Sequence, residues 1–224
     1  MSKRRIRQSF VPNVVNVWLG REMLGMKFKA MLVFGDLSQN MRSGRGLPTG
    51  IVWASNRYDT VTLTHLGLGR GLAVTALLIA NAYATLANGG KTVAPHLVAK
   101  VVSTNGVASI HEAKAPPMRV FSDETSKTIA SMLKEAMITA GKEFSVDLEG
   151  LDIAGMVSET RIPVNGEYSE TDCNVAAAGF FPAESPKWVV VIGFGKPSPD
   201  HLAGRVALPV FVEIARKITS ASCE

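Results

Sequence analysis

One short pattern in this sequence has residue types at a spacing that supports covalent chemistry. Ser131-Met132-Leu133-Lys134 places a hydroxyl and an amine one helical turn apart, so the lysine could accept the serine proton during nucleophilic attack. The apolar residues Met132 and Leu133 belong to the predicted stripe of a helix, which directs Ser131 and Lys134 to its polar side. We therefore interpret the pattern as a solvated helix face.

A glycine-rich run before a helix suggests a phosphate site, because backbone N–H groups at a helix N-terminus bind anions. Gly67-Leu68-Gly69-Arg70-Gly71 has this form, but position 72 is leucine and no Gly-Lys-Ser/Thr follows. We interpret it as a tight turn into the helix. Ser38-Gln39-Asn40 has serine and asparagine at a catalytic spacing, but it lies in a loop rich in Gly, Ser and Arg.

The histidines and cysteines are too dispersed for a metal site or a disulfide framework. They are His65, His96, His111, His201, Cys173 and Cys223. No histidine is placed to complete a serine or cysteine triad. We expect no metal and no cofactor.

The composition is that of a folded domain. The 224 residues are 46% hydrophobic and 19% charged, which excludes a disordered chain. The net charge of +5 comes from cations spread along the chain, so we expect no nucleic-acid partner. The longest apolar run, Trp188–Phe194, is far shorter than the roughly 20 residues that span a bilayer. The basic start is followed by Pro12 and Asn13, which interrupt the apolar centre that an export signal needs.

The elements that would position any site are predicted from periodicity and caps. Residues 1–34 contain two short helices, and residues 35–60 form a surface loop. Three further helices are predicted: Thr75–Ala87, capped by Thr75 and ended by Gly89-Gly90; Ser122–Gly141; and Arg205–Ile218. The middle helix has the apolar stripe Ile129, Met132, Leu133, Ala136 and Met137.

The order and spacing of the predicted strands indicate an antiparallel sheet. Leu97–Val102 and Val107–Ile110 flank an Asn-Gly turn and form a hairpin. Asp152–Val157, Val175–Phe180 and Trp188–Phe194 are spaced as an antiparallel meander. The predicted fold class is α/β, a single domain over residues 1–224 with an antiparallel sheet flanked by helices.

Several segments share one further pattern: Leu66–Thr75 followed by Ala80–Gly90, Phe34-Gly35, Arg45–Pro48 with Trp53, Ala178–Ala183 and Pro209–Phe211. In this order they resemble the transpeptidase domain of penicillin-binding proteins, most closely the class B members that serve cell division or elongation. The resemblance covers nearly all of this chain but only the C-terminal part of the family domain. It implies the penicillin-binding protein and serine β-lactamase fold, incomplete on its N-terminal side.

The resemblance also implies where family chemistry would lie. In the family, a Ser-x-x-Lys serine attacks D-Ala-D-Ala or a β-lactam, a Ser-x-Asn shuttles protons, and a Lys-Thr-Gly strand docks the substrate carboxylate. The nucleophile would precede Phe34-Gly35 by a long stretch, so we expect it to be missing from these residues. The Ser-x-Asn would lie near Ser9 and Asn13, whose spacing differs from the family pattern.

The family's third motif, Lys-Thr-Gly, is replaced by other residues in this sequence. The family's Ala-Gly-Lys-Thr-Gly-Thr matches Ala154–Glu159, so Met156, Val157, Ser158 and Glu159 stand for Lys, Thr, Gly and Thr. This changes the local formal charge by about −2 where a carboxylate and an oxyanion would bind. Met156 and Val157 also suit an ordinary sheet strand. We expect a catalytically inactive, truncated domain that acts as a binding or scaffold module.

The family's sheet has five strands, two of them from before the nucleophile. Without these, Trp188–Phe194 would form an apolar sheet edge that promotes pairing. We expect a complementary transpeptidase fragment, a second copy of this chain or cell-wall synthesis proteins as partners. One half of a split D,D-transpeptidase remains the alternative, and a repurposed small-ligand module is a third. Full-length family members act at the periplasmic face of the inner membrane, whereas this sequence shows no anchor and its compartment stays open.

Overall fold

The structure is a computed structural model of the chain. It describes residues 74–95, 100–105, 108–110, 116–164, 167–197 and 203–221. The chain divides into two compact units, 1–78 and 79–224, and the described residues belong almost entirely to the second. The helices predicted within 1–34 and the loop predicted over 35–60 lie outside the described residues.

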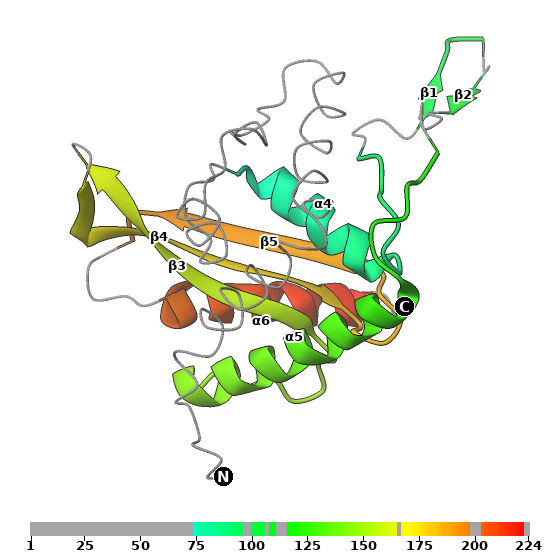
Figure 1. The fold of residues 1–224 in the computed structure, drawn as a ribbon. Coiled ribbons are helices and arrows are strands. Elements are labelled where there is room, and N and C mark those ends of the chain that lie inside the picture. The colour runs from blue at the N-terminus through cyan, green and yellow to red at the C-terminus, as the bar shows by residue number, and fades with distance from the viewer. Residues whose placement is uncertain are drawn as a thin grey trace, which may run out of the picture. The chain divides into compact units, whose positions relative to one another are not determined.

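The centre of the second unit is an antiparallel sheet. Its strands are β3 (Ala154–Val164), β4 (Glu167–Phe181) and β5 (Trp188–Gly195), in the spatial order β3-β4-β5. The predicted meander is therefore confirmed, and Figure 1 shows the three strands side by side between helices. Among the described residues, the α/β fold class with an antiparallel sheet is also confirmed.

The first two strands are longer than predicted. Beyond Val157, β3 continues to Val164, and β4 begins at Glu167, eight residues before the predicted start at Val175. These outer halves pair with each other, for example Thr160 with Asn174, and their side chains are mostly exposed. Because both of their faces are polar, they lack the apolar alternation that predicts a strand.

Among the described residues, three helices flank the sheet, and the N-caps of two of them agree with the sequence. They are α4 (Ala76–Ala87), α5 (Asp123–Phe144) and α6 (Ala203–Ala221). The Thr75 hydroxyl accepts a hydrogen bond from the Leu78 N–H at 3.2 Å, and the Ser122 hydroxyl accepts one from the Thr125 N–H at 3.0 Å. None of the described helices is long and apolar enough to cross a membrane.

Two details of α5 differ from the prediction. The helix continues through Gly141 to Phe144 and ends at Ser145, which has the left-handed conformation. A Cβ at Gly141 would overlap the Leu148 side chain, so this glycine serves packing and does not end the helix. Met132, predicted in the apolar stripe, is 63% exposed, because the inward face centres on Met137 and Ala140.

The small hairpin is confirmed within the described residues. Its strands are β1 (Lys100–Val102) and β2 (Ala108–Ile110), which pair antiparallel with Val101 opposite Ser109. Figure 1 shows this hairpin standing away from the three-stranded sheet.

One face of the sheet, here called the α6 face, carries the larger core. Its side chains pack against α6 and the second half of α5, and α6 lies mainly over β4. Phe181 meets Phe211 of α6 edge to face, with ring centroids 6.4 Å apart. The fully or nearly buried members of this cluster are Met137, Ala140, Ile153, Val175, Ala177, Phe181, Ala207, Leu208, Phe211, Val212 and Ala215.

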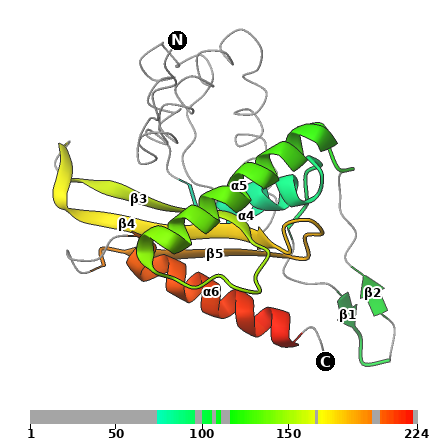
Figure 2. The same ribbon diagram turned by 90° about the horizontal axis from the view of Figure 1, so that it is seen from below.

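The opposite face, here called the α4 face, has a smaller core. Its buried members are Ala154, Phe180 and Ala183, which pack against side chains of α4 and the first half of α5. Tyr83 of α4 meets the Phe180 ring at 6.5 Å, and burial raises the pKa of Tyr83 to about 12. Figures 1 and 2 show α4 and α6 on opposite sides of the strands.

Candidate functional site

The residues singled out from the sequence, Met156 to Glu159, lie in the inner half of β3. They pair with β4, with Met156 opposite Ala178, Val157 opposite Ala177 and Ser158 opposite Ala176. The β4 residues opposite Met156, Val157 and Ser158 are all alanines, whose side chains are small. The structure therefore places all four residues on a regular, well-paired strand.

Alternation along the strand separates these four residues into two pairs. Val157 packs into the cluster on the α6 face, so Glu159 points to that side as well. Met156 and Ser158 point to the α4 face together with Ala154. Met156 is 37% exposed and Ser158 is exposed. Strand periodicity alone could have predicted that the four do not form one cluster.

Two glycines determine how β3 meets β4 beside this site. Gly155 and Gly179 are directly opposite each other in the register. A Cβ on Gly155 would lie 2.5 Å from the Ala178 carbonyl oxygen and 2.9 Å from the Met137 methyl carbon. A Cβ on Gly179 would lie 2.6 Å from the Ala154 carbonyl oxygen. The close approach of α5 and of the paired strands thus requires glycine at both positions.

An ion pair anchors Asp152, which lies two positions before the first residue of β3. Lys134 Nζ lies 2.6 Å from Asp152 Oδ1, and Asp152 Oδ2 accepts a hydrogen bond from the Glu184 N–H at 3.2 Å. Burial by itself raises the pKa of Asp152. The hydrogen bonds from Lys134 and from backbone N–H groups outweigh it and lower that pKa overall.

This ion pair determines whether Lys134 can serve as the base of the Ser-x-x-Lys pattern at Ser131. The hydrogen bond to Asp152 and the charge of that carboxylate raise the pKa of Lys134, so its amine stays protonated and cannot act as a base. Ser131 is exposed, as predicted, whereas Lys134 turns toward the start of β3. Sequence reasoning missed Asp152 as its partner, because 18 residues separate the two.

Cys173 lies on β4, the strand that pairs with β3. Cys173 pairs with Arg161 in the β3–β4 register. Burial and the negative charges of Glu159 and Asp172 raise the pKa of the Cys173 thiol, while Arg161 opposes them. The thiol therefore stays protonated near neutral pH.

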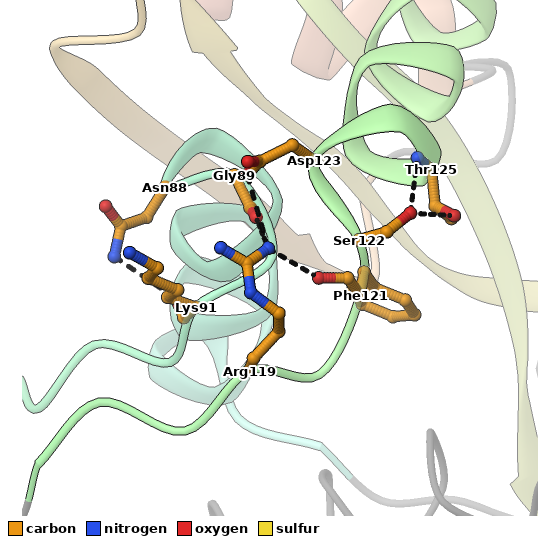
Figure 3. A network of polar contacts seen from close by, with 8 residues as sticks. All are labelled: Asn88, Gly89, Lys91, Arg119, Phe121, Ser122, Asp123 and Thr125. Atoms are coloured by element: carbon orange, nitrogen blue, oxygen red, sulfur yellow. Dashed lines mark hydrogen bonds and ion pairs between the residues drawn. The ribbon is translucent and has the colours of Figure 1, made fainter.

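A polar network joins the end of α4 to the start of α5, as Figure 3 shows. Arg119 Nη1 donates to the carbonyl oxygens of Gly89 and Phe121, at 3.0 Å and 3.1 Å, and lies 3.2 Å from Asp123 Oδ1. A Cβ on Gly90 would lie closer to the Phe121 carbonyl than any real contact allows. This network sets α4 beside α5, and no local pattern in the sequence indicated a role for Arg119.

Other predicted positions fall outside the described residues. They are Ser9, Asn13, Ser38–Asn40, Gly67–Gly71, His65, His96, His111, His201 and Cys223. In the part of the chain that the structure describes, no group of three His, Cys, Asp or Glu side chains could hold a metal ion.

The antiparallel sheet with helices packed on both of its faces defines an α/β protein, as the family resemblance implies. A family model for the penicillin-binding protein transpeptidase domain matches residues 13–216. The chain therefore belongs to the penicillin-binding protein transpeptidase family.

Curated relatives and solved structures agree with this assignment. Penicillin-binding protein PbpB of Mycolicibacterium smegmatis is 29% identical over 216 residues, which are 91% of this chain and 33% of the relative. The probable peptidoglycan D,D-transpeptidase PenA of Neisseria flavescens is 24% identical over 81% of this chain and 44% of its own length. The chain thus spans between a third and a half of the length of these relatives.

The fold is also shared with penicillin binding protein 3 of Mycobacterium tuberculosis, solved in complex with aztreonam. The TM-score is 0.76 at 24% sequence identity, and the match covers 94% of this chain and 49% of that one. At this identity the likeness shows the fold alone.

Proposed function

We propose that this chain is a non-catalytic binding or scaffold module of peptidoglycan cross-linking, unable by itself to form the acyl-enzyme of a D,D-transpeptidase. The observation that carries the proposal is the side-chain set of β3. Where the family resemblance expects Lys-Thr-Gly, the strand presents Met156, Val157 and Ser158, followed by Glu159. Its partners would be other cell-wall synthesis proteins or a complementary fragment.

The chemistry of β3 supports a loss of carboxylate binding. A lysine at this position supplies a cation for the carboxylate that ends a stem peptide, and Met156 offers only a neutral thioether. Val157 lacks a hydroxyl, and its side chain is packed into the core of the α6 face. The exposed Glu159 carboxylate lies on the α6 face of the same strand and adds a negative charge three residues along from Met156.

Neither Ser131 nor Ser158 is an activated nucleophile for the acyl step. Forming an ester needs a serine with a base in hydrogen-bond reach and donors for the oxyanion. Ser131 has no base, because Lys134 is held protonated by Asp152. Ser158 lies opposite Ala176, which carries no titratable group.

A split transpeptidase is the second candidate, and the backbone of β3 favours it. The Gly155–Gly179 pairing and the regular register up to Arg161 keep the strand in a shape that can accept an extended peptide. In this alternative another polypeptide supplies the Ser-x-x-Lys serine, and β3 contributes backbone hydrogen bonds only.

The first experiment asks whether the chain forms a covalent adduct. The purified 224-residue chain is incubated with a fluorescent penicillin, and its intact mass is measured. We expect the unmodified mass throughout. A penicilloyl ester on any serine of the chain would overturn the proposal.

A second experiment asks whether Met156 and Glu159 prevent carboxylate binding. The double variant Met156→Lys, Glu159→Thr restores the family residues at both positions and raises the net charge by two. Met132→Lys, Glu135→Thr makes the same change on the exposed side of α5. With a peptide ending in D-Ala-D-Ala, calorimetry should detect binding for the β3 variant alone. Equal binding by both variants would indicate nonspecific charge attraction and contradict the assignment of β3.

The split alternative has its own test. The DNA upstream is searched for a reading frame that encodes Ser-x-x-Lys, and its product is expressed together with this chain. A penicillin adduct that forms on that product only in the presence of this chain would establish the split enzyme. The same adduct formed equally without this chain favours the scaffold role.

A further inference from the structure

The segment between α4 and α5 leaves the sheet and returns to the place where it started. α4 ends at Ala87 and α5 begins at Asp123, and the hairpin strands β1 and β2 lie between them. Figures 1 and 2, whose views differ by 90°, both show this hairpin away from the three-stranded sheet. Among the described helices and strands, the main contacts of β1 and β2 are with each other.

This segment buries little of its own surface. Every residue between 93 and 118 whose burial the structure describes is exposed, namely 93–95, 102–105 and 116–118. They include the apolar residues Val93, Val102 and Met118, which are 38%, 56% and 47% exposed. Because shared apolar burial is what makes two parts of a fold unfold together, the hairpin is weakly coupled to the sheet.

The base of the segment is closed by its own backbone pairing. The Thr92 N–H donates to the Met118 carbonyl oxygen at 2.9 Å, and the Met118 N–H donates to Thr92 Oγ1 at 2.8 Å. One residue further in, Lys91 and Arg119 form an antiparallel bridge. The outgoing and returning legs are therefore joined before the chain reaches the hairpin.

A second layer of contacts ties this base to both helices. The Val120 and Phe121 N–H groups donate to the Gly90 carbonyl oxygen at 2.7 Å and 3.2 Å. Gly90 is buried and has a φ of +82°, a left-handed conformation that glycine adopts without strain. The Arg119 contacts of Figure 3 join the end of α4 to the start of α5 at the same point. The ends of the two helices are thus held by residues that precede and follow the hairpin.

We propose that the β1–β2 hairpin is a conformationally independent arm, isolated from the sheet by a clamp formed by residues 88–92 and 118–123. A two-stranded hairpin is only marginally stable by itself, so the arm opens at a free energy well below that of global unfolding. The clamp keeps α4 and α5 in place while the arm opens. The arm can therefore present or withdraw its strands without disturbing β3. This device goes beyond the proposed function and would hold for an active or an inactive domain.

The first test removes the arm. Replacing residues 93–117 by Asn-Gly joins Thr92 to Met118 through a two-residue turn, which suits two legs that already pair antiparallel. By circular dichroism, the melting temperature should equal or exceed that of the full chain, because a shorter loop loses less entropy on closure. A melting temperature lower by more than about 3 °C would show that the arm stabilises the sheet and would overturn the proposal.

The second test asks what the clamp holds. Arg119→Ala should lower the melting temperature by the same amount in the full chain and in the shortened chain, because Arg119 joins the two helices. Lys127→Ala, which removes an exposed cation from α5, is the control and should change neither. A loss confined to the full chain would mean that Arg119 supports the arm alone. That result, or no loss in either chain, contradicts the clamp.

Hydrogen exchange in the full chain tests independence directly. At low urea, the paired amides of β1 and β2 should exchange at least about tenfold faster than those of residues 175–181 in β4. Their rates should also stay constant over the urea range that accelerates exchange in β4. Rates that rise in parallel in both places would show that the hairpin opens only when the sheet unfolds. Penicillin adduct formation is measured separately, so the arm and the proposed function can fail independently.

Discussion

The two faces of the sheet are built differently. Among the described residues, eleven buried residues form one cluster on the α6 face, and all of them are apolar. On the α4 face the described buried cluster has three members, and helix α4 carries two buried polar residues, Asn81 and Thr85. Within the part of the chain that the structure describes, the α6 face therefore carries the larger apolar core.

This difference bears on where the site residues lie. Val157, on the α6 face, is held by the large cluster, so its size and polarity are constrained by packing. Met156 and Ser158, on the α4 face, are exposed and contribute little to the core. Side chains at these two positions can therefore change without unfolding the protein.

The sharpest test of the comparison truncates one fully buried phenylalanine on each face. Phe211→Ala should lower the free energy of unfolding by about 4–5 kcal/mol, because it opens a cavity in the large cluster. Phe180→Ala should cost about 3 kcal/mol, because fewer buried neighbours surround it. Urea denaturation measures both. Equal losses would mean that the two faces stabilise the unit equally.

A second prediction concerns the backbone contact beneath the site. Gly179→Ala should lower the free energy of unfolding by about 2–3 kcal/mol, because its Cβ meets the Ala154 carbonyl oxygen and cannot be accommodated by a side-chain rotation. Gly193→Ala, on the same sheet but with open space around it, is the matched control and should change stability by less than about 1 kcal/mol. Similar losses for both variants would argue against the tight glycine pair.

A third prediction uses the polar residue buried in α4. The side-chain amide of Asn81 is 4% exposed and has no hydrogen-bond partner among the described residues. Asn81→Leu should raise the free energy of unfolding by about 1 kcal/mol, because it removes the cost of burying an unpaired amide. Asn81→Asp should lower stability, since it buries an unpaired carboxylate. Thermal unfolding gives the two signs, and a loss in the leucine variant would show that the amide is satisfied.

The smallest expected effect depends on pH. The lowered pKa of Asp152 adds stability that is present above its usual value of 3.8 and is lost as the pH falls through the lowered value. The raised pKa of Lys134 adds stability that is present below 10.5 and is lost as the pH rises through the raised value.

Replacing the carboxylate isolates this contribution. Asp152→Asn should lower stability at pH 7 by up to about 1 kcal/mol, and the difference from wild type should shrink toward pH 3. Urea denaturation at several pH values measures it. A difference that stays constant down to pH 3 would exclude the ion pair as its source.

Much of the fold could be predicted from local chemistry. The caps at Thr75 and Ser122 and the turn at Gly89-Gly90 depend on a few adjacent residues, so they were visible in the sequence. The outer half of the β3–β4 hairpin was not visible in the sequence, because strand pairing stabilises it while both of its faces are polar. The exposure of Met132 followed from the placement of α5 on the sheet, which periodicity did not determine.

The candidate site was predicted less completely. The resemblance located β3, and the structure places Met156 to Glu159 on that strand. The Lys134–Asp152 ion pair and the Gly155–Gly179 contact join residues that are 18 and 24 positions apart. Such contacts depend on the sheet register, which no local pattern in the sequence specifies.

The facing glycines have a consequence for how this domain can change over evolutionary time. Neither can gain a side chain unless a strand or a packed helix moves, so a substitution at either position disturbs the course of the backbone. The exposed side chains of Met156 and Ser158 carry no such constraint. Residues on this strand can therefore vary over evolutionary time while the backbone keeps its shape.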